Sequence, residues 1–488
     1  MITEADASSP AQGSFRDPGG RLYRIDGRIL RAVEPSHAAP LETFLSSKIA
    51  REAAARGILV LSKQVPAAEY PELGSTDIWE HERIPFPSFP YEWPPEMLEA
   101  AASLTLDLAE AAIEEGFGLK DATPYNILFR GAQPVFVDVL SFERRDPLDP
   151  TWLAYGQFVR TFLLPLAAHR YFGLPVNQIL TGQRDGIEPE MLYQWAGWLR
   201  RLTPPLLGLV SLPKWMAGRS QDGKGSYRSR PASSPEQARF ILGGLLRSCR
   251  RQLKALAPKQ HKQSTWSGYL DHKSLYSSSE LEEKQRFVSE ALDLALGGAT
   301  KRRARVLDVG ANEGRFSLLA ARQGAEVVAI DSDPVVTGSI WRRAAAENLN
   351  VLPLVVDFTR PTPAVGWRNQ ECASFLDRAS GLDSGGGHFD LVMMLAVAHH
   401  ILVTERIPLE DLLGLADQLT REYVLIEYVA PEDPMFQRIV RGRDQLYAHF
   451  SPDWFEAAAR SRFELVRSAR VGGLHRWLYL FRRRRAAN

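Results

Sequence analysis

The sequence predicts two folded parts, an N-terminal α+β part and a C-terminal α/β part whose strands form a parallel, doubly wound sheet. From Lys301 onward, short apolar strands alternate with helices, which is the order that builds such a sheet. Earlier in the chain, a hairpin signal precedes segments that are mostly helical. The predicted boundaries are a disordered tail over residues 1–20, a first part over 21–215, a linker with a basic helical segment over 216–256, and a second part over 257–488.

The composition is that of a globular chain and excludes several classes of protein. Of 488 residues, 45% are hydrophobic and 24% are charged. With 59 basic and 58 acidic residues the formal net charge is +1, so no chain-wide attraction for nucleic acid is expected. Cys249 and Cys372 form neither a disulfide framework nor a CxxC metal site. Neither a secretory signal nor a membrane-spanning apolar run is present, so we expect a cytoplasmic protein. No pattern indicates an oligomeric state.

The N-terminal elements follow from turn and capping signals. Two alternating runs flank Asp26-Gly27, a pair of residues typical of a β-hairpin. Two short apolar runs further on, NILF and VFVDVLSF, are separated by a short turn and predict a second hairpin. The other expected elements are a helix over 41–56, a strand over 58–65, an ordered connection over 79–93, a helix over 96–115 and helices over 152–212.

A glycine motif between a strand and a helix opens the C-terminal part. Its residues are Asp308-Val309-Gly310-Ala311-Asn312-Glu313-Gly314, whereas a dinucleotide fingerprint would need glycine at positions 312 and 315. This D-x-G-x-x-x-G form resembles the first motif of class I methyltransferases that use S-adenosylmethionine (SAM). Gly310 and Gly314 let backbone approach a ligand closely because they have no Cβ. Asp308 supplies negative charge near the amino group of the ligand or near an ordering water.

The resemblance to class I methyltransferases also assigns the strand ends that follow. Asp331 ends the strand EVVAID, where an acid accepts hydrogen bonds from both ribose hydroxyls. Asp357 ends the strand PLVVD and would meet the adenine amino group, with Phe358 against the adenine ring. The later strands FDLVMML, YVLIEYV, FELV and RWLYLF complete a Rossmann-like seven-stranded domain with an antiparallel finish. The alternative is another Rossmann-like nucleotide binder, although the missing glycines argue against NAD.

Aromatic residues precede this domain in the segment TWSGYLDHKSLY. Trp266, Tyr269 and Tyr276 stand where class I methyltransferases often carry a lid over SAM. A cationic sulfonium favours aromatic faces nearby, which suits this role. The alternative for each residue is plain packing of the following helix onto the sheet.

The acceptor side of the reaction is predicted around two histidines. Methyl transfer is an in-line displacement, in which an enzyme mainly aligns donor and acceptor and excludes water. His399 and His400 follow the fourth strand, and Glu427 ends the fifth strand on the same edge. Their predicted roles are general base, substrate hydrogen bond or metal ligand, and the alternative is a helix-capping or core pair. Because no third histidine or spaced carboxylate cluster supports metal binding beside this pair, no metal is expected.

A second motif lies in the N-terminal part, in LKDATPYNILFRGAQPVFVDVLSFE. The spacing of Asp121, Asn126 and Asp138 resembles the catalytic loop and metal-binding Asp of protein kinases and aminoglycoside-phosphotransferase-like enzymes. In those enzymes the first Asp orients the acceptor hydroxyl, and the Asn and the second Asp hold Mg²⁺ against nucleotide phosphates. The alternative is a helical domain in which the three residues serve turns.

This second motif departs from the kinase pattern in four respects. Leu119 replaces the usual histidine, and Val139-Leu140 replaces the Phe-Gly pair. No glycine-rich phosphate loop precedes the first hairpin, and no strand lysine precedes the helix that begins at Leu41. These departures argue against ATP contact from the first hairpin and the strand that follows it. They favour a degenerate module with a binding or structural role over a module that transfers phosphate.

Taken together, FPSFPYEW, LKDATPYN, PVFVDVLSFE, WSGY and LAVAHHI resemble a bacterial family of large SAM-dependent methyltransferases, the nodulation-protein-like (NoeA-like) family. The resemblance runs from about Arg21 to the end and implies a kinase-like module fused to a methyltransferase. It predicts SAM as cofactor and an unidentified methyl acceptor, which the N-terminal module holds or selects. The alternatives are a phosphotransferase whose C-terminal part senses SAM and a non-catalytic scaffold.

Overall fold

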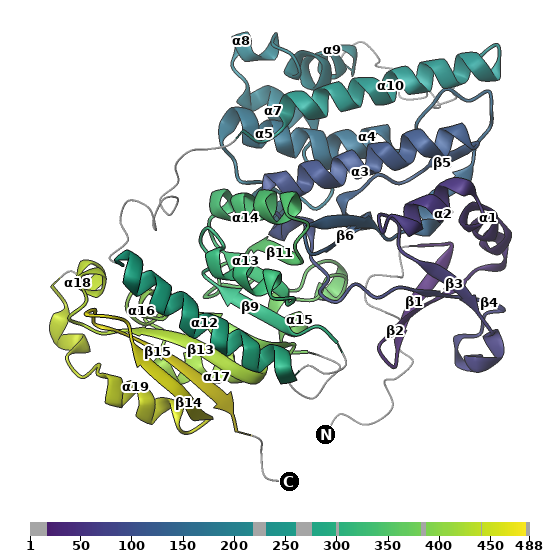
Figure 1. Ribbon diagram of the computed structural model, residues 1–488. Coiled ribbons are helices and arrows are strands. Elements are labelled where there is room, and N and C mark those ends of the chain that lie inside the picture. Colours follow the sequence, from purple (N-terminus) through teal and green to yellow (C-terminus); the bar gives the residue numbers. More distant parts are fainter. Residues whose placement is uncertain are drawn as a thin grey trace. The chain divides into compact units, whose positions relative to one another are not determined.

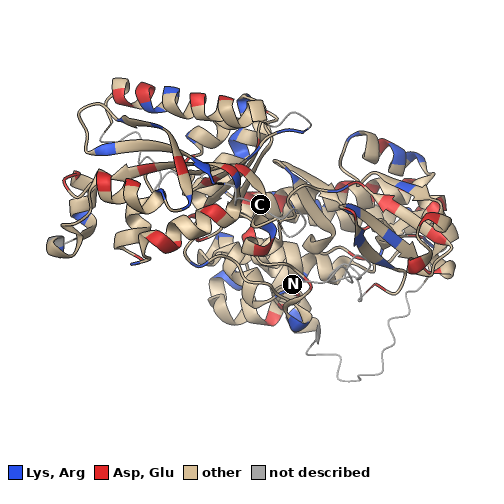
Figure 2. Cartoon of the chain, turned by 90° about the horizontal axis from the view of Figure 1, so that it is seen from below, with Lys and Arg blue, Asp and Glu red and all other residues tan. Residues whose placement is uncertain are grey.

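The computed structural model describes residues 17–217, 231–259, 276–298, 302–381, 387–440 and 442–484. The chain divides into an N-terminal unit, Met1–Gln260 with Gly366–Cys372, and a C-terminal unit, His261–Val365 with Ala373–Asn488 (Figure 1). Basic and acidic residues are interspersed on the side seen in Figure 2. Within the described ranges, no helix combines the length and the apolar character needed to cross a membrane.

The N-terminal unit begins with an antiparallel sheet of four strands in the order β1-β2-β4-β3. The predicted hairpin at Asp26-Gly27 is confirmed, because both residues have positive φ, 48° and 75°, as a tight hairpin turn requires. Leu30 and Ile78 are fully buried in the core beneath this sheet. The strands are β1 (Gly20–Ile25), β2 (Arg28–Val33), β3 (Ser62–Val65) and β4 (Asp77–His81).

Three predicted elements of this unit have different bounds in the structure. The single helix expected over 41–56 is two helices, α1 (Pro35–Leu45) and α2 (Lys48–Ala55). The break occurs because the Ser47 side chain caps α2 by accepting a hydrogen bond from the backbone N–H of Ala50. The strand expected over 58–65 is confined to β3, and the expected connection over 79–93 begins inside β4.

Helices and short strand pairs make up the rest of this unit. Strands β6 (Ile127–Arg130) and β7 (Gln133–Phe136) form the second predicted hairpin, and β5 (Phe117–Leu119) pairs with β8 (Phe142–Arg144). The helices are α3 (Pro95–Glu114), α4 (Tyr155–Phe158), α5 (Leu164–Phe172), α6 (Val176–Gly182), α7 (Pro189–Trp195), α8 (Trp198–Arg201), α9 (Leu212–Ala217) and α10 (Pro235–Leu256). Short 3₁₀ turns are η3 (Ala67–Glu69), η4 (Pro71–Leu73), η5 (Pro90–Glu92), η6 (Pro124–Asn126) and η7 (Val139–Ser141). Two π-helical stretches, η8 (Val159–Leu163) and η9 (Leu207–Ser211), run directly into α5 and α9.

The C-terminal unit is built on a seven-stranded sheet in the order β11-β10-β9-β12-β13-β15-β14. Neighbours from β11 to β13 are parallel, and β15 runs antiparallel to both β13 and β14. The chain moves outward from β9 to β11 and then crosses back to β12. A ligand crevice is expected at the carboxyl ends of the strands, at this switch point. The strands are β9 (Arg305–Val309), β10 (Glu326–Asp331), β11 (Val351–Val355), β12 (Phe389–Met394), β13 (Thr420–Val429), β14 (Phe463–Arg470) and β15 (Arg476–Arg483).

Helices enclose the central strands of this sheet. Nearly every residue of β9, β11 and β12 is buried, which is typical of strands covered on both faces. The helices are α12 (Ser278–Gly298), α13 (Arg315–Arg322), α14 (Pro334–Ala346), α15 (Phe375–Ala379), α16 (Ala398–Val403), α17 (Leu409–Leu419), α18 (Pro434–Val440) and α19 (Pro452–Ala459), with short turns η10 (Trp367–Asn369) and η11 (Asp444–Tyr447).

Candidate functional site

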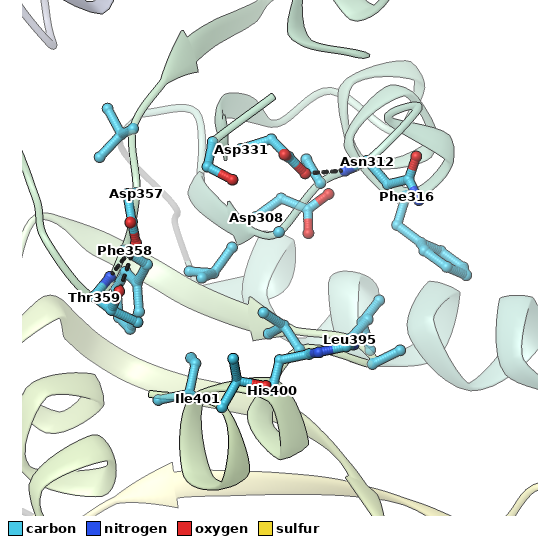
Figure 3. Close-up of a pocket in the computed structure, with 18 of the residues that line it drawn as sticks. Asp308, Asn312, Phe316, Asp331, Asp357, Phe358, Thr359, Leu395, His400 and Ile401 are labelled. Atoms are coloured by element: carbon cyan, nitrogen blue, oxygen red, sulfur yellow. Dashed lines mark hydrogen bonds between the residues drawn. The ribbon is translucent and has the colours of Figure 1, made fainter. Parts of the chain in front are cut away.

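A cavity of about 330 Å³ opens at the carboxyl ends of the parallel strands in the C-terminal unit. This volume is within the range that holds a small ligand or cofactor. Most of the residues that the sequence assigned to SAM line it, on the loops that follow β9, β10 and β11. Figure 3 shows three groups facing one another: Asp308, Asn312 and Asp331; Asp357, Phe358 and Thr359; Leu395, His400 and Ile401.

The loop after β9 is shaped by its two glycines, which serve different purposes. Gly310 and Gly314 have φ of 69° and 74°, a left-handed conformation that favours glycine. A Cβ on Gly310 would lie 3.0 Å from Val397, and Gly310 lines the cavity. A Cβ on Gly314 would lie only 2.7 Å from Ile340 on α14. Gly314 is absent from the described cavity lining, so close helix packing explains it better than the predicted approach to a ligand.

Asn312 holds the same loop against the next strand. Its φ is 49°, and Asn is one of the few residues that tolerate this left-handed conformation. Its backbone N–H donates a 2.9 Å hydrogen bond to Oδ2 of Asp331, while Oδ1 of Asp331 accepts from the backbone of Asp333 at 3.0 Å. The side-chain oxygen of Asn312 is buried and has no hydrogen-bond partner among the described residues. A ligand donor in the cavity would satisfy it.

The three carboxylates of the cavity have different electrostatic environments. Asp308 is 3% exposed, and burial raises its pKa to about 6 although Ser317 donates a 2.5 Å hydrogen bond to it. Burial also raises the pKa of Asp331. At Asp357 burial again acts to raise the pKa, but hydrogen bonds from Thr359 and Arg360 outweigh burial, so the pKa is lowered. Asp308 and Asp331 would therefore gain most from a cation or hydrogen-bond donor in the cavity.

A buried charge cluster borders the cavity and joins α12 to β13 and β15. Lys284 Nζ donates to Oε2 of Glu427 at 2.5 Å, and the Tyr276 hydroxyl donates to Oε1 of the same carboxylate. Arg476 donates to the Tyr276 hydroxyl at 2.5 Å and pairs with Asp433 at 2.8 Å. Tyr276 and Lys284 also line the cavity. Lys284 was not predicted from the sequence, because a single lysine among the glutamates at the start of a helix matches no known motif.

Glu427 has a different place from the one that the sequence predicted. Burial acts to raise its pKa, but Lys284 and Arg476 outweigh burial and lower it, so the carboxylate stays ionised. Glu427 is fully buried and is not among the described residues that line the cavity. The prediction that it faces the acceptor is therefore corrected: its carboxylate belongs to an internal ion pair with Lys284.

The two adjacent histidines separate into a cavity residue and a core residue. His400 lines the cavity, and burial lowers its pKa, with a smaller contribution from Arg476. His399 is 1% exposed, and neither ring nitrogen has a hydrogen-bond partner among the described residues. Ala396, with φ of 55°, makes the turn that leads from β12 into α16. This strained backbone is of the kind found at ligand sites.

The three motif residues of the N-terminal unit come together through hydrogen bonds. Asn126 donates to the Ser141 hydroxyl at 3.1 Å and to the backbone oxygen of Asp121 at 3.3 Å. The Ser141 hydroxyl in turn donates to Asp138, which pairs with Arg31 at 3.3 Å. Burial, and then the negative charge of Asp138, raise the pKa of Asp121.

Arg31 is a second residue that the sequence reasoning missed. It lies on β2, is 4% exposed, and pairs with Asp17 at 2.7 Å as well as with Asp138. The strand before α1 carries this arginine and no lysine. The available signal was a basic residue within the apolar run RILRAV.

Two predicted cofactor residues lie outside the described part of the chain. Trp266 and Tyr269 belong to residues 260–275, so their lid role stays a prediction. Tyr276, the third aromatic of that segment, is described and lines the cavity.

Comparison with known proteins agrees with this fold. Residues 281–484 match the family model described as "Methyltransferase domain". With its glycine motif and strand-end acids, this domain is a class I methyltransferase domain, and the chain is an S-adenosylmethionine-dependent methyltransferase. The whole chain is similar to nodulation protein NoeA of Rhizobium meliloti (strain 1021), at 28% identity over 489 residues, covering 99% of this chain and 98% of that protein. The predicted resemblance is thus confirmed.

Several solved structures are also similar to parts of the chain. The bifunctional kinase-methyltransferase WbdD is 21% identical with a TM-score of 0.31, and the match covers 46% of this chain and 44% of WbdD, under half of its length. The N-methyltransferase NodS from Bradyrhizobium japonicum WM9 is 13% identical with a TM-score of 0.30, covering 42% of this chain and 98% of NodS. Magnesium protoporphyrin IX methyltransferase from Synechocystis PCC 6803 is 16% identical with a TM-score of 0.29, covering 44% and 88%.

Proposed function

We propose that the C-terminal cavity binds SAM and that the chain transfers its methyl group to an acceptor which the N-terminal unit holds or selects. The observation that supports this most is the meeting of Asp308, Asp331 and Asp357 in one cavity at the switch point of the sheet. No acceptor class is favoured by the described residues of the cavity.

In the proposed binding mode, each acid at the end of a strand contacts a different part of SAM. Asp331 accepts hydrogen bonds from the ribose hydroxyls, since a carboxylate retains free lone pairs after accepting two backbone N–H groups. Asp357 meets the adenine amino group, with Phe358 against the ring. Asp308 faces the ligand's ammonium group.

The ligand's carboxylate would be placed by cations that line the same cavity. Lys284 and Arg315 both line it, and they supply positive charge at the end of the cavity that Tyr276 and Phe316 also border. The Lys284 ammonium lies 4.8 Å from the centre of the Tyr276 ring and 5.2 Å from that of Phe316. The hydrogen bond to Glu427 holds the ammonium in position. The Phe316 ring lines the cavity, and in the proposed binding mode it would face the ligand sulfonium.

His400 is the proposed general base for an acceptor that must lose a proton. In the transfer, the acceptor atom forms a bond to the methyl carbon while the sulfur–carbon bond breaks, and sulfur keeps the electron pair. Because burial lowers the pKa of His400, the ring is neutral near pH 7 and able to take the acceptor's proton. Alignment of the two reactants and exclusion of water supply the remaining rate enhancement.

For the N-terminal unit we propose a kinase-like module that has lost phosphotransfer. Support comes from the antiparallel sheet, the two hairpins and the convergence of Asp121, Asn126 and Asp138. One carboxylate oxygen of Asp138 is engaged by Arg31 and the other by Ser141, which competes with Mg²⁺ for the same atoms. This engagement favours a holding role over the alternative, an active phosphotransferase with a SAM-sensing C-terminal part.

The proposed reaction is tested with SAM that carries a labelled methyl group, the full chain and a fractionated cell extract. We expect label to enter one extract molecule while demethylated SAM accumulates in equal amount. A chain that binds SAM yet labels nothing in any fraction would contradict methyl transfer.

A further inference from the structure

The helical end of the N-terminal unit carries an exposed apolar patch. Seven large apolar side chains on or next to α7, α8 and α9 are at least 43% exposed, and Trp198 reaches 71%. Exposed apolar groups that gather in one place mark interaction surfaces. We call this set the tryptophan patch; its members are Trp195, Trp198, Leu199, Leu202, Leu212, Trp215 and Met216.

Side-chain contacts tie together the helices that carry the tryptophan patch. The guanidinium of Arg201 on α8 lies 3.9 Å from the centre of the Tyr193 ring on α7. The indole N–H of Trp215 on α9 donates to the Tyr193 hydroxyl at 3.3 Å. Trp195 packs edge-on against Phe172, with ring centres 6.2 Å apart. Figure 1 shows α8 and α9 beyond α5 and α7 at the top edge of the view.

The segment 193–217, which carries every member of the tryptophan patch, has charges of one sign only, and the acid of α7, Glu190, lies in the first turn of that helix. Residues 193–217 contain the cations Arg200, Arg201 and Lys214 and no Asp or Glu. Apolar side chains interleaved with cations are complementary to a surface that is negative outside and apolar just beneath. A bilayer with anionic headgroups has this construction, and Trp, Arg and Lys are the residues that favour its interface.

A second copy of the chain fits the tryptophan patch less well. In a symmetric dimer the same patch would lie on both sides of the interface. Arg200, Arg201 and Lys214 would then face their own copies without an acid in 193–217 to neutralise them. Two of the three most exposed members, Trp198 and Leu199, lie on the four-residue helix α8, and their exposure suits shallow insertion into a headgroup layer.

We propose that the tryptophan patch attaches the protein peripherally to anionic lipid surfaces. The apolar tips, led by Trp198, enter the boundary between headgroups and acyl chains, and the three cations contact lipid phosphates. None of the patch residues is among the described residues that line the SAM cavity, and this attachment would hold the enzyme at a membrane surface.

The test is sedimentation of the full chain with vesicles of phosphatidylcholine alone or with one third phosphatidylglycerol. We expect binding to the anionic vesicles and its loss in about 0.5 M salt, where charge interactions are screened. Trp198→Ala should weaken binding on the order of tenfold, since it removes a buried aromatic side chain. Lys214→Gln should weaken it about fivefold, since one basic residue near the surface contributes about 1 kcal/mol.

Trp367→Ala is the matched control, because Trp367 is 65% exposed and lies outside the tryptophan patch. It should bind anionic vesicles like the wild type. Equal binding by the Trp198→Ala and Trp367→Ala variants, or no sedimentation of the wild type, would overturn the proposal. So would a lipid-free dimer that Trp198→Ala converts to a monomer in light scattering, since the patch would then serve a second copy. Salt-insensitive binding to neutral vesicles would overturn the role of the cations.

Discussion

The ammonium of Lys284 lies 2.5 Å from the carboxylate of Glu427, and both side chains are buried in the C-terminal unit. The pair joins α12 to β13, and Lys284 also borders the cavity. A buried charge is tolerated only when it is paired and hydrogen-bonded. The helix that carries Lys284 is thus fixed to the sheet by the same contact that fixes one wall of the cavity.

Glu427→Gln should destabilise the chain strongly, because it leaves the Lys284 and Arg476 charges without a buried carboxylate between them. Breaking one side of a buried ion pair costs about 3–5 kcal/mol. The unfolding free energy of the C-terminal transition in urea measures this. Glu422→Gln is the control, since Glu422 lies on the same strand and pairs with Arg482, which is half exposed. The control should lose no more than about 1 kcal/mol. Equal losses of unfolding free energy in both variants would show that the buried cluster stabilises the chain no more than an exposed ion pair does.

SAM affinity should rise with pH through about 6. Because burial raises the pKa of Asp308 to about 6, this side chain is protonated and neutral in the free protein below that value. A ligand ammonium favours the ionised form, so binding must expel a proton at low pH, and this cost vanishes above about pH 7. Calorimetric titrations at several pH values measure the slope. Asp308→Asn should flatten it, and a wild-type slope in this variant would exclude Asp308 as its source.

His400→Ala should lower methyl transfer by about 10²–10⁴-fold while SAM affinity barely changes, because a base acts on the acceptor and not on the cofactor. The labelled-methyl assay and a SAM titration on the same sample separate the two effects. His399→Leu is the neighbouring control. It removes two buried ring nitrogens that lack partners, so stability should stay or rise and turnover should persist. Full turnover in His400→Ala would leave alignment alone as the source of catalysis.

The N-terminal unit should not hydrolyse ATP in the presence of Mg²⁺. Arg31 and Ser141 already occupy the carboxylate of Asp138. A coupled hydrolysis assay on the full chain checks this, with Asp138→Ala as the variant that identifies the source of any signal. Robust hydrolysis that disappears in Asp138→Ala would restore the phosphotransferase alternative.

The sequence predicted those features that depend on local pattern. Asp331 and Asp357 could be placed because an acid directly after an apolar strand lies at the carboxyl edge of a parallel sheet, where the cavity was found. The hairpin at Asp26-Gly27 was predictable because few residue pairs adopt two positive φ values. The sequence predicted that position 314 requires glycine, but it gave the approach of a ligand as the reason. In the structure the reason is close packing against the side chain of Ile340.

The rest depends on contacts between residues far apart in the chain. Glu427 was assigned to the acceptor because nothing in the sequence pairs it with Lys284, 143 positions earlier. Arg31 and Asp138 are 107 positions apart, so their ion pair was equally hidden. His399 and His400 could not be told apart, since which of two adjacent side chains faces a cavity depends on the turn at Ala396.

The measurement that tests the central claim most directly is a calorimetric titration of the full chain with SAM, comparing wild type with Asp331→Ala. The wild type should bind one SAM per chain. The variant should bind roughly tenfold more weakly or worse, because it loses charge-assisted hydrogen bonds to ribose worth about 1.5–3 kcal/mol. Asp411→Ala, which removes an exposed acid in the first turn of α17, should bind like the wild type. Equal SAM affinity in wild type and Asp331→Ala, or no SAM binding by the wild type, would contradict the account.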